Sequence, residues 1–212
     1  MRELIEIARD LARSGERRIL GIAGAPGAGK STLAAAIVDA LDGRARLAPM
    51  DGYHLAQAEL ERLGRADRKG APDTFDAPGY VALLRRLRAA GEEIVYAPRF
   101  DRHAEEPVAG AIGIEREVPL VVTDGNYLLL DDGPWRQVRG LLDAAWFVQV
   151  DDDLRRSELV ERHMRHGRSP EAAEDWVRRV DEPNATLVAA SRDRADLVVS
   201  RSGVVAVDQS GR

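Results

Sequence analysis

The chain has 212 residues, 44% of them hydrophobic and 32% charged, and this length suits one well-cored domain. Its formal net charge of −5 argues against a general binder of nucleic acids or of acidic membranes. The absence of cysteine excludes disulfides and thiolate metal sites and favours a cytoplasmic protein, and no apolar window is long enough for a membrane span.

The hydrophobic pattern predicts strands that alternate with helices. Apolar residues at helical spacing predict a helix over 1–15, a second from near Lys30 to Gly43, and a third over 80–90. This alternation predicts an α/β fold with a doubly wound, mostly parallel sheet and helices on both faces. The predicted strands are 18–24, 46–50, 93–98, 119–125, 144–151 and 195–200.

Residues 24–31 read GAPGAGKS and match the phosphate-loop pattern G-x-x-x-x-G-K-[ST] between a predicted strand and a predicted helix. Such a loop turns backbone N–H groups toward phosphate oxygens, and the helix after it points its positive end at them. Lys30 would reach the β- and γ-phosphates of ATP, Ser31 would ligate Mg²⁺, and Thr32 would contact the α-phosphate. The alternative is a glycine-rich turn without a ligand. The predicted nucleotide-binding residues are Gly24, Ala25, Pro26, Gly27, Ala28, Gly29, Lys30, Ser31 and Thr32.

A phosphate loop alone does not say what happens to the γ-phosphate. The guanine-recognition pattern N-K-x-D is absent, and the D-x-x-G match at 76–79 lies in a loop that enters a helix. A GTPase switch is therefore disfavoured. Transfer of the phosphoryl group to a small molecule is the favoured fate.

Residues 49–55 read PMDGYHL, in which Asp51 follows the second predicted strand. In a doubly wound sheet this edge borders the same crevice as the phosphate loop. A carboxylate at this edge would orient a weakly nucleophilic hydroxyl group and accept its proton. The alternative is that Asp51 only caps a helix beginning near His54.

The chain resembles the phosphoribulokinase/uridine kinase family of P-loop kinases, and most closely the members described as fructose transport system kinases. The segments that carry the resemblance are GAPGAGKST, PMDGYHL, RKGAPDTFD, VYAPRFDR, VVTDGNYLLLD and DEPNATLV. It implies one P-loop kinase domain over 1–212 with a P-loop NTPase-type fold and a small helical lid around 152–182. It also implies ATP and Mg²⁺ as cofactors and an alcohol group of a small metabolite as the acceptor.

The resemblance assigns roles to residues around the acceptor. Asp51 matches the catalytic base of the family, beside Lys30 in the phosphate loop. Asp76 lies in the segment that closes over the acceptor, but it is equally placed to cap the next helix. The acceptor-contacting residues that we predict on this basis are Tyr53, His54, Asp73, Arg99, Asp101 and Arg102.

Two further positions concern the metal and the lid. Asp124 ends an apolar strand where phosphate-loop enzymes place a carboxylate for Mg²⁺. Relatives usually carry glutamate there, so the shorter aspartate favours contact through water. Arg155 and Arg162 are seven residues apart on one predicted helical face and match lid arginines that close over the phosphates. The alternative for Arg162 is an i,i+4 ion pair on a solvated helix.

The leading function is an ATP-dependent kinase for a sugar or sugar derivative, with fructose as one candidate. The predicted acceptor residues are polar and only 5% of the chain is aromatic, which favours a polyhydroxylated acceptor over a stacked base. A nucleoside or pantothenate-type kinase is the second alternative, although the uridine kinase pattern Y-D-F-x-x-H-x-R is not reproduced. A nucleotide-binding regulator of a transport system is the third. The sequence does not determine the oligomeric state.

Overall fold

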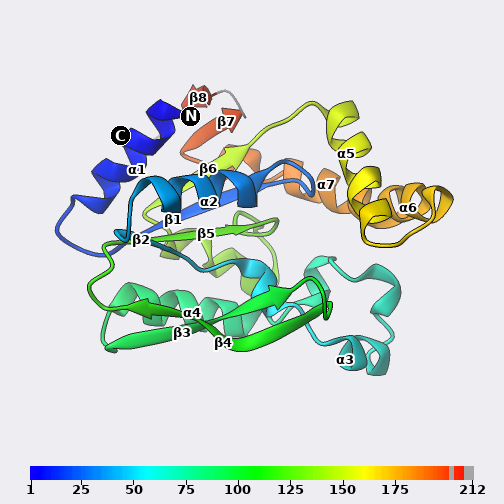
Figure 1. The fold of residues 1–212 in the computed structure, drawn as a ribbon, viewed down its shortest axis with the longest axis horizontal. Helices are drawn as coiled ribbons and strands as arrows, with labels where there is room; N and C mark the ends of the chain where they lie inside the picture. Colours follow the sequence, from blue (N-terminus) through cyan, green and yellow to red (C-terminus); the bar gives the residue numbers. More distant parts are fainter. Residues whose placement is uncertain (201–202, 208–212) are drawn as a thin grey trace.

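A six-stranded sheet forms the centre of the computed structural model, which describes residues 1–200 and 203–207 (Figure 1). Its strand order is β2-β5-β1-β6-β7-β8. Strands β2, β5, β1, β6 and β7 run parallel to one another, and β8 pairs antiparallel with β7. The mostly parallel, doubly wound sheet is therefore confirmed. The strands are β1 (Arg18–Gly24), β2 (Ala45–Leu47), β5 (Leu120–Gly125), β6 (Ala144–Val148), β7 (Leu197–Ser200) and β8 (Gly203–Val207).

Helices cover both faces of the sheet, because successive strand residues point to opposite sides. In β1, Leu20 and Ile22 pack with α1 and α2, whereas Ile19 and Ala23 belong to the core that contains α4. Figure 1 shows α1 and α2 above the sheet and α4 below it. The α-helices are α1 (Arg2–Ala12), α2 (Lys30–Ala40), α3 (Gln57–Arg62), α4 (Ala77–Ala89), α5 (Asp152–Arg165), α6 (Pro170–Trp176) and α7 (Glu182–Ala189).

The second predicted strand, 46–50, is shorter than expected. β2 ends at Leu47, and the chain turns into a 3₁₀ helix over Met50–Tyr53. Pro49 lies between them and has no N–H group to continue the ladder. The prediction of a helix starting near His54 is also wrong, because α3 begins three residues later, at Gln57. Asp51 consequently lies within a tight turn.

A separate two-stranded ribbon lies beneath this turn (Figure 1). β3 (Ile94–Asp101) extends the strand predicted over 93–98, and it pairs antiparallel with β4 (Glu106–Glu115), which was not predicted. Small residues and two glycines in β4 hide its strand pattern from sequence reasoning. A Cβ atom at Gly52 would collide with the carbonyl oxygen of Pro98, so the turn and the ribbon touch through their backbones.

The predicted lid region contains α5, α6, a π-helical turn over Val177–Asp181, and the start of α7. Asp151 caps α5 by accepting hydrogen bonds from the N–H groups of Asp153 and Leu154. In Figure 1 α5 and α6 stand at one end of the sheet. None of the helices in the described ranges combines the length and apolarity that crossing a membrane requires.

Candidate active site

The phosphate loop joins β1 to α2 in a conformation that only glycine adopts easily. Gly27 and Gly29 have φ angles of +80° and +91°, in the left-handed region. A Cβ atom at Gly27 would also lie 2.8 Å from Cγ of Leu159 on α5. The loop is therefore shaped for backbone contact with a ligand and is covered closely by α5.

Lys30 is the first residue of α2 and is only 9% exposed. Its Nζ donates a hydrogen bond to the carbonyl oxygen of Ala25 at 2.9 Å. Burial lowers the pKa of Lys30 from 10.5 to about 8, although the carboxylates of Asp124 and Asp51 oppose this shift. Within the described ranges no carboxylate lies within 4.0 Å of the ammonium group, which the phosphates of a nucleotide would stabilise.

Ser31 and Asp124 form a pair beside Lys30. The hydroxyl of Ser31 donates to Oδ2 of Asp124 at 2.5 Å, while Oδ1 of Asp124 is buried and has no hydrogen-bond partner among the described residues. Burial raises the pKa of Asp124, and the hydrogen bond from Ser31 partly offsets this effect. The described residues contain no group of three or more His, Cys, Asp or Glu side chains that would hold a metal alone. The orphaned oxygen fits Mg²⁺ bound by one hydroxyl, one carboxylate, water and phosphate.

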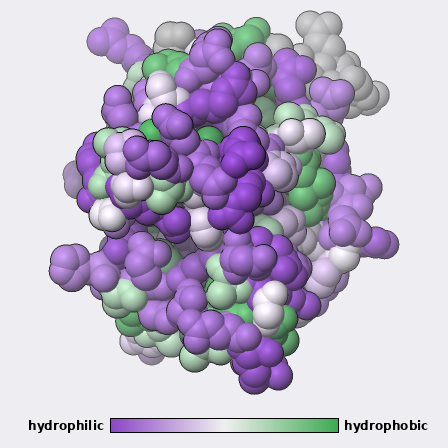
Figure 2. All heavy atoms as spheres, turned by 90° about the vertical axis from the view of Figure 1, so that its right-hand side faces the viewer, coloured by the Kyte–Doolittle hydropathy of each residue, from purple (hydrophilic) through white to green (hydrophobic). Residues whose placement is uncertain are grey.

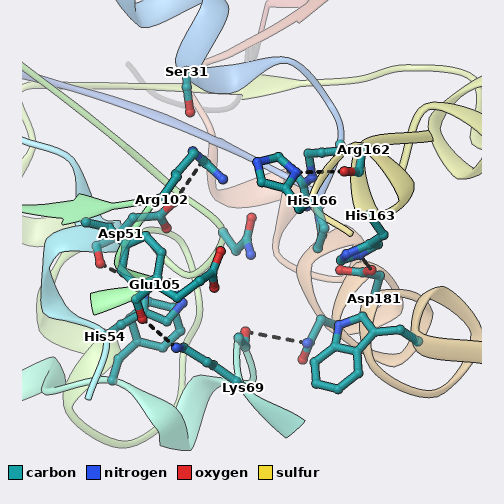
Figure 3. A pocket seen from close by; sticks show the side chains of 18 of the residues that line it. Ser31, Asp51, His54, Lys69, Arg102, Glu105, Arg162, His163, His166 and Asp181 are labelled. Carbon is teal, nitrogen blue, oxygen red and sulfur yellow. Dashed lines mark hydrogen bonds and ion pairs between the residues drawn. The ribbon is translucent and has the colours of Figure 1, made fainter. Parts of the chain in front are cut away.

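These residues share a cavity of about 760 Å³ with the 3₁₀ turn, the ribbon and the predicted lid region. In Figure 3, Asp51, His54 and Arg102 lie on one side of the cavity, and Arg162, His163 and Asp181 lie across from them. Figure 2 shows the side of the molecule that carries α5, α6 and α3, and hydrophilic residues cover most of it. The cavity can therefore hold phosphates at one end and a polar acceptor at the other.

Asp51 lies between the phosphate loop and the ribbon. Its Oδ2 is 3.7 Å from Nη2 of Arg102, which follows β3 in the turn to β4. The residues that precede the 3₁₀ turn and α3 are Pro49 and Ala56, and neither helix has a side-chain cap. Asp51 therefore caps neither helix, and the capping alternative is wrong. The carboxylate lines the cavity instead.

Only two of the six predicted acceptor residues, His54 and Arg102, line the cavity. Tyr53 instead packs edge-on against Tyr80, with ring centroids 5.5 Å apart, and burial raises its pKa to about 12. Asp73 forms ion pairs with Arg68 at 2.9 Å and with Arg65 at 3.3 Å. The side chains of Tyr53 and Asp73 therefore contact nearby residues outside the cavity, and the sequence pattern does not reveal these contacts.

Arg99 and Asp101 also lie outside the lining. Arg99 is exposed on β3, where alternate side chains point away from the turn. Asp101 accepts hydrogen bonds from the backbone N–H groups of His103 and Ala104 at 2.8 and 3.0 Å, and so fixes the turn of the ribbon. Asp76 caps α4, as the capping alternative predicted, by accepting from the N–H of Gly79 at 2.9 Å.

The two predicted lid arginines differ in their surroundings. Arg162 lines the cavity, burial lowers the pKa of its guanidinium, and no carboxylate of a described residue lies within 4.0 Å of it. Arg155 is 2% exposed and forms ion pairs with Asp152 at 2.9 Å and Glu182 at 2.5 Å. One of its nitrogens also lies 3.5 Å from the carbonyl oxygen of Pro26. Arg155 therefore ties α5 to the phosphate loop, whereas Arg162 is available to a ligand.

Sequence reasoning missed a group of lining residues in the predicted lid region. Nε2 of His163 lies 2.8 Å from Oδ2 of Asp181, and the guanidinium of Arg168 lies 4.0 Å from the ring centroid of Trp176. Asp181 belongs to DEPNATLV, one of the segments that carried the family resemblance. This membership was the feature of the sequence that could have identified Asp181 as a site residue.

Aromatic rings also line the cavity. Phe75, Phe100 and Trp176 are among its walls. These rings come from three segments far apart in the sequence, so the polar character of the predicted acceptor residues does not extend to the whole cavity.

Comparisons with known proteins agree on one family. The family model described as "Phosphoribulokinase / Uridine kinase family" matches residues 19–208. A protein named "putative uridine kinase" from Schizosaccharomyces pombe is 32% identical over 94% of this chain and 89% of its own length. A pantothenate kinase from Limosilactobacillus reuteri is 34% identical over 64% of this chain and 46% of its own length. The crystal structure of a "putative fructose transport system kinase" from Silicibacter sp. TM1040 is 35% identical, covering 92% of this chain and 97% of that one, with a TM-score of 0.84.

Proposed function

Because the chain belongs to the phosphoribulokinase/uridine kinase family, we propose that it transfers the γ-phosphoryl group of ATP to a hydroxyl of a small polyhydroxylated metabolite. The observation that carries this proposal is the placement of Asp51 and Lys30 in one cavity with Ser31 and Asp124. The phosphate loop and the carboxylate of Asp51 therefore face the same space, as phosphoryl transfer to an alcohol would require.

At the phosphate end, the chain's own groups bind and orient the nucleotide. Lys30 would move from the carbonyl oxygen of Ala25 to the phosphates, and α2 would direct its positive end at them. Ser31 and Asp124 would hold Mg²⁺, which would neutralise charge on the phosphate oxygens. Arg162 would approach from the lid and stabilise charge on the moving phosphoryl group.

At the acceptor end, Asp51 would accept the proton of the attacking hydroxyl. The ion pair with Arg102 at 3.7 Å orients the carboxylate toward the cavity and leaves it partly exposed. Lys69 and Arg102 line the same end, so an acceptor that carries an anionic group is also accommodated. Sugars, sugar phosphates and sugar acids match this combination of polar groups.

A nucleoside kinase is the second candidate, and the aromatic walls favour it. Phe100 and Trp176 line the cavity and would be the rings on which a base stacks, although His54 and Lys69 already contact the ring of Phe100. Trp176 is already covered by the guanidinium of Arg168, which reduces the area open to a base. We therefore place the polyhydroxylated acceptor first.

An ADP-release assay with ATP and Mg²⁺ tests the proposal directly. Sugars, sugar phosphates and sugar acids should stimulate ADP production, whereas uridine, cytidine and pantothenate should not. Robust turnover of uridine would replace the sugar proposal with the nucleoside one. Turnover that no compound accelerates would favour a nucleotide-binding regulator of a transport system.

The variant Asp51→Asn tests the proposed base separately. Transfer to the acceptor should fall by roughly 10²- to 10⁴-fold, the usual contribution of a general base. The affinity for MgATP, measured by calorimetry, should stay within a few-fold because Asp51 would contact the acceptor side. Lys30→Ala should weaken both binding and transfer. An Asp51 variant with full transfer would show that this carboxylate is not the base.

A further inference from the structure

The hydroxyl of Thr123 interrupts the apolar run of a buried strand. Thr123 lies in β5 after three apolar residues and directly before Asp124, and it is fully buried. A buried hydroxyl costs free energy unless it is hydrogen-bonded, and a valine of the same shape would fill the same space. Packing alone therefore does not account for a threonine at this position.

The hydroxyl of Thr123 joins two other segments of the chain. It donates a hydrogen bond to the carbonyl oxygen of Ala48 at 2.6 Å, and it lies 2.7 Å from the hydroxyl oxygen of Tyr80 on α4. A carbonyl oxygen only accepts and the threonine hydroxyl carries one proton, so Tyr80 must donate to Thr123. All three residues are fully buried. The hydrogen bonds therefore run in one direction, from α4 through β5 to the end of β2.

Ala48 is the point at which the chain leaves the sheet. β2 ends at Leu47, yet the N–H of Ala48 still donates to the carbonyl oxygen of Val122 at 2.8 Å. Pro49 follows and has no N–H group to donate to a further ladder bond. The side chain of Thr123 therefore holds the chain next to β5 at the residue before this break in the ladder.

A second contact joins the same two segments two residues further along. A Cβ atom on Gly125 would lie 2.6 Å from Cβ and Sδ of Met50, which is fully buried. Gly125 therefore lets the first residue of the 3₁₀ turn pack directly against the end of β5. Asp51 follows Met50 and Asp124 precedes Gly125, so both carboxylates are attached to backbone that these contacts hold together.

We propose that Thr123 is a positioning residue for phosphoryl transfer: its hydroxyl holds Ala48 against β5 and thereby sets the place of Asp51 relative to Asp124. This inference rests on the proposed function, in which Asp51 would accept a proton and Asp124 would hold Mg²⁺ beside the phosphates. A displacement of about 1 Å between reacting groups can cost roughly 10²-fold in rate. Tyr80 orients the hydroxyl of Thr123, but the bond to Ala48 does not require it.

Substitutions at Thr123 test the hydroxyl apart from the shape of the side chain, with the compound that turns over in the ADP-release assay as acceptor. Thr123→Val should lower kcat by about 10- to 100-fold. The affinity for MgADP, measured by calorimetry, should stay within a few-fold because the phosphate loop is untouched. Thr123→Ser keeps the hydroxyl and should restore kcat to within a few-fold of wild type. Equal kcat in Thr123→Val and wild type would overturn the proposal.

Variants at Tyr80 separate positioning from stability. Thr123→Val leaves the hydroxyl of Tyr80 buried without its partner, which should lower the urea midpoint of unfolding. Tyr80→Phe keeps the bond from Thr123 to Ala48 and should retain kcat. The double variant should regain part of the midpoint but keep the low kcat of Thr123→Val. If kcat instead follows the midpoint across these variants, Thr123 has only a structural role.

Hydrogen exchange tests the placement of the turn without turnover. In the 3₁₀ turn the N–H of Gly52 donates to the carbonyl oxygen of Pro49 at 3.4 Å, and that of His54 donates to the carbonyl oxygen of Asp51 at 3.2 Å. In Thr123→Val these two amides should exchange faster by a larger factor than the amides of β1, which report global unfolding. Thr123→Ser should abolish the difference. An equal factor in the turn and in β1 would refute the hold of Thr123 on the turn.

The outcomes separate this inference from the proposed function. Absence of turnover with every class of compound would refute the proposed function, and the exchange of Gly52 and His54 would still decide whether Thr123 holds the turn. Turnover that Thr123→Val leaves intact would refute the role of Thr123 while the kinase assignment stands.

Discussion

The buried ammonium group of Lys30 predicts that nucleotide binding takes up a proton. In the free protein its pKa is about 8, because burial disfavours the charged form. Bound phosphates would favour the charged form and return the pKa to its ordinary value of 10.5 or above. The group is therefore partly neutral before binding and charged afterwards.

The size of this uptake follows from the fraction of Lys30 that is neutral in the free protein. With a pKa of about 8, that fraction corresponds to about 0.1 proton per nucleotide at pH 7, about 0.5 at pH 8 and about 0.9 at pH 9. Because protons are taken up, the affinity for the nucleotide should fall as pH rises through 8.

Calorimetric titration of MgATP in buffers with different ionisation enthalpies measures the protons taken up at each pH. The matched control is Lys30→Arg. Its guanidinium also carries a positive charge, and unlike the ammonium group of Lys30 it stays protonated throughout this pH range. Its uptake at pH 8 and 9 should be close to zero. A constant uptake between pH 7 and 9, or equal uptake by Lys30→Arg, would refute the assignment of the proton to Lys30.

Three further substitutions test other parts of the structure. Arg155→Ala should lower the free energy of unfolding by about 1–3 kcal/mol in urea titrations, because it removes the buried contacts with Glu182 and Pro26 while Arg156 still pairs with Glu182 at 3.0 Å; unchanged stability would show that the tie is unimportant. Asp76→Ala should cost about 1 kcal/mol in the same assay through loss of the α4 cap, and unchanged stability would contradict that role. Asp124→Asn should keep the contact with Ser31 but require at least about tenfold more Mg²⁺ for half-maximal transfer. An unaltered Mg²⁺ dependence would remove Asp124 from the metal site.

Features encoded by neighbouring residues were predictable from the sequence. The phosphate loop over 24–31 combines glycines, Lys30 and Ser31 in one short segment, and the loop lies between the expected strand and helix. The alternation of Ile19 and Leu20 between the two faces likewise follows from the geometry of a strand. Such features depend on local backbone geometry, which the local sequence largely determines.

The arrangement of side chains at the acceptor end of the cavity depends on contacts between residues far apart in the sequence. Only the tertiary structure therefore showed which side chains line it. Asp51 meets Arg102 because the ribbon packs on the 3₁₀ turn, and this contact requires the unpredicted strand β4. The π-helical turn likewise brings Asp181 to His163. Tyr53 and Asp73 have side chains suited to ligand binding, but nearer partners occupy them. The type of a residue limits which hydrogen bonds and ion pairs its side chain can form, and packing determines which of these it does form.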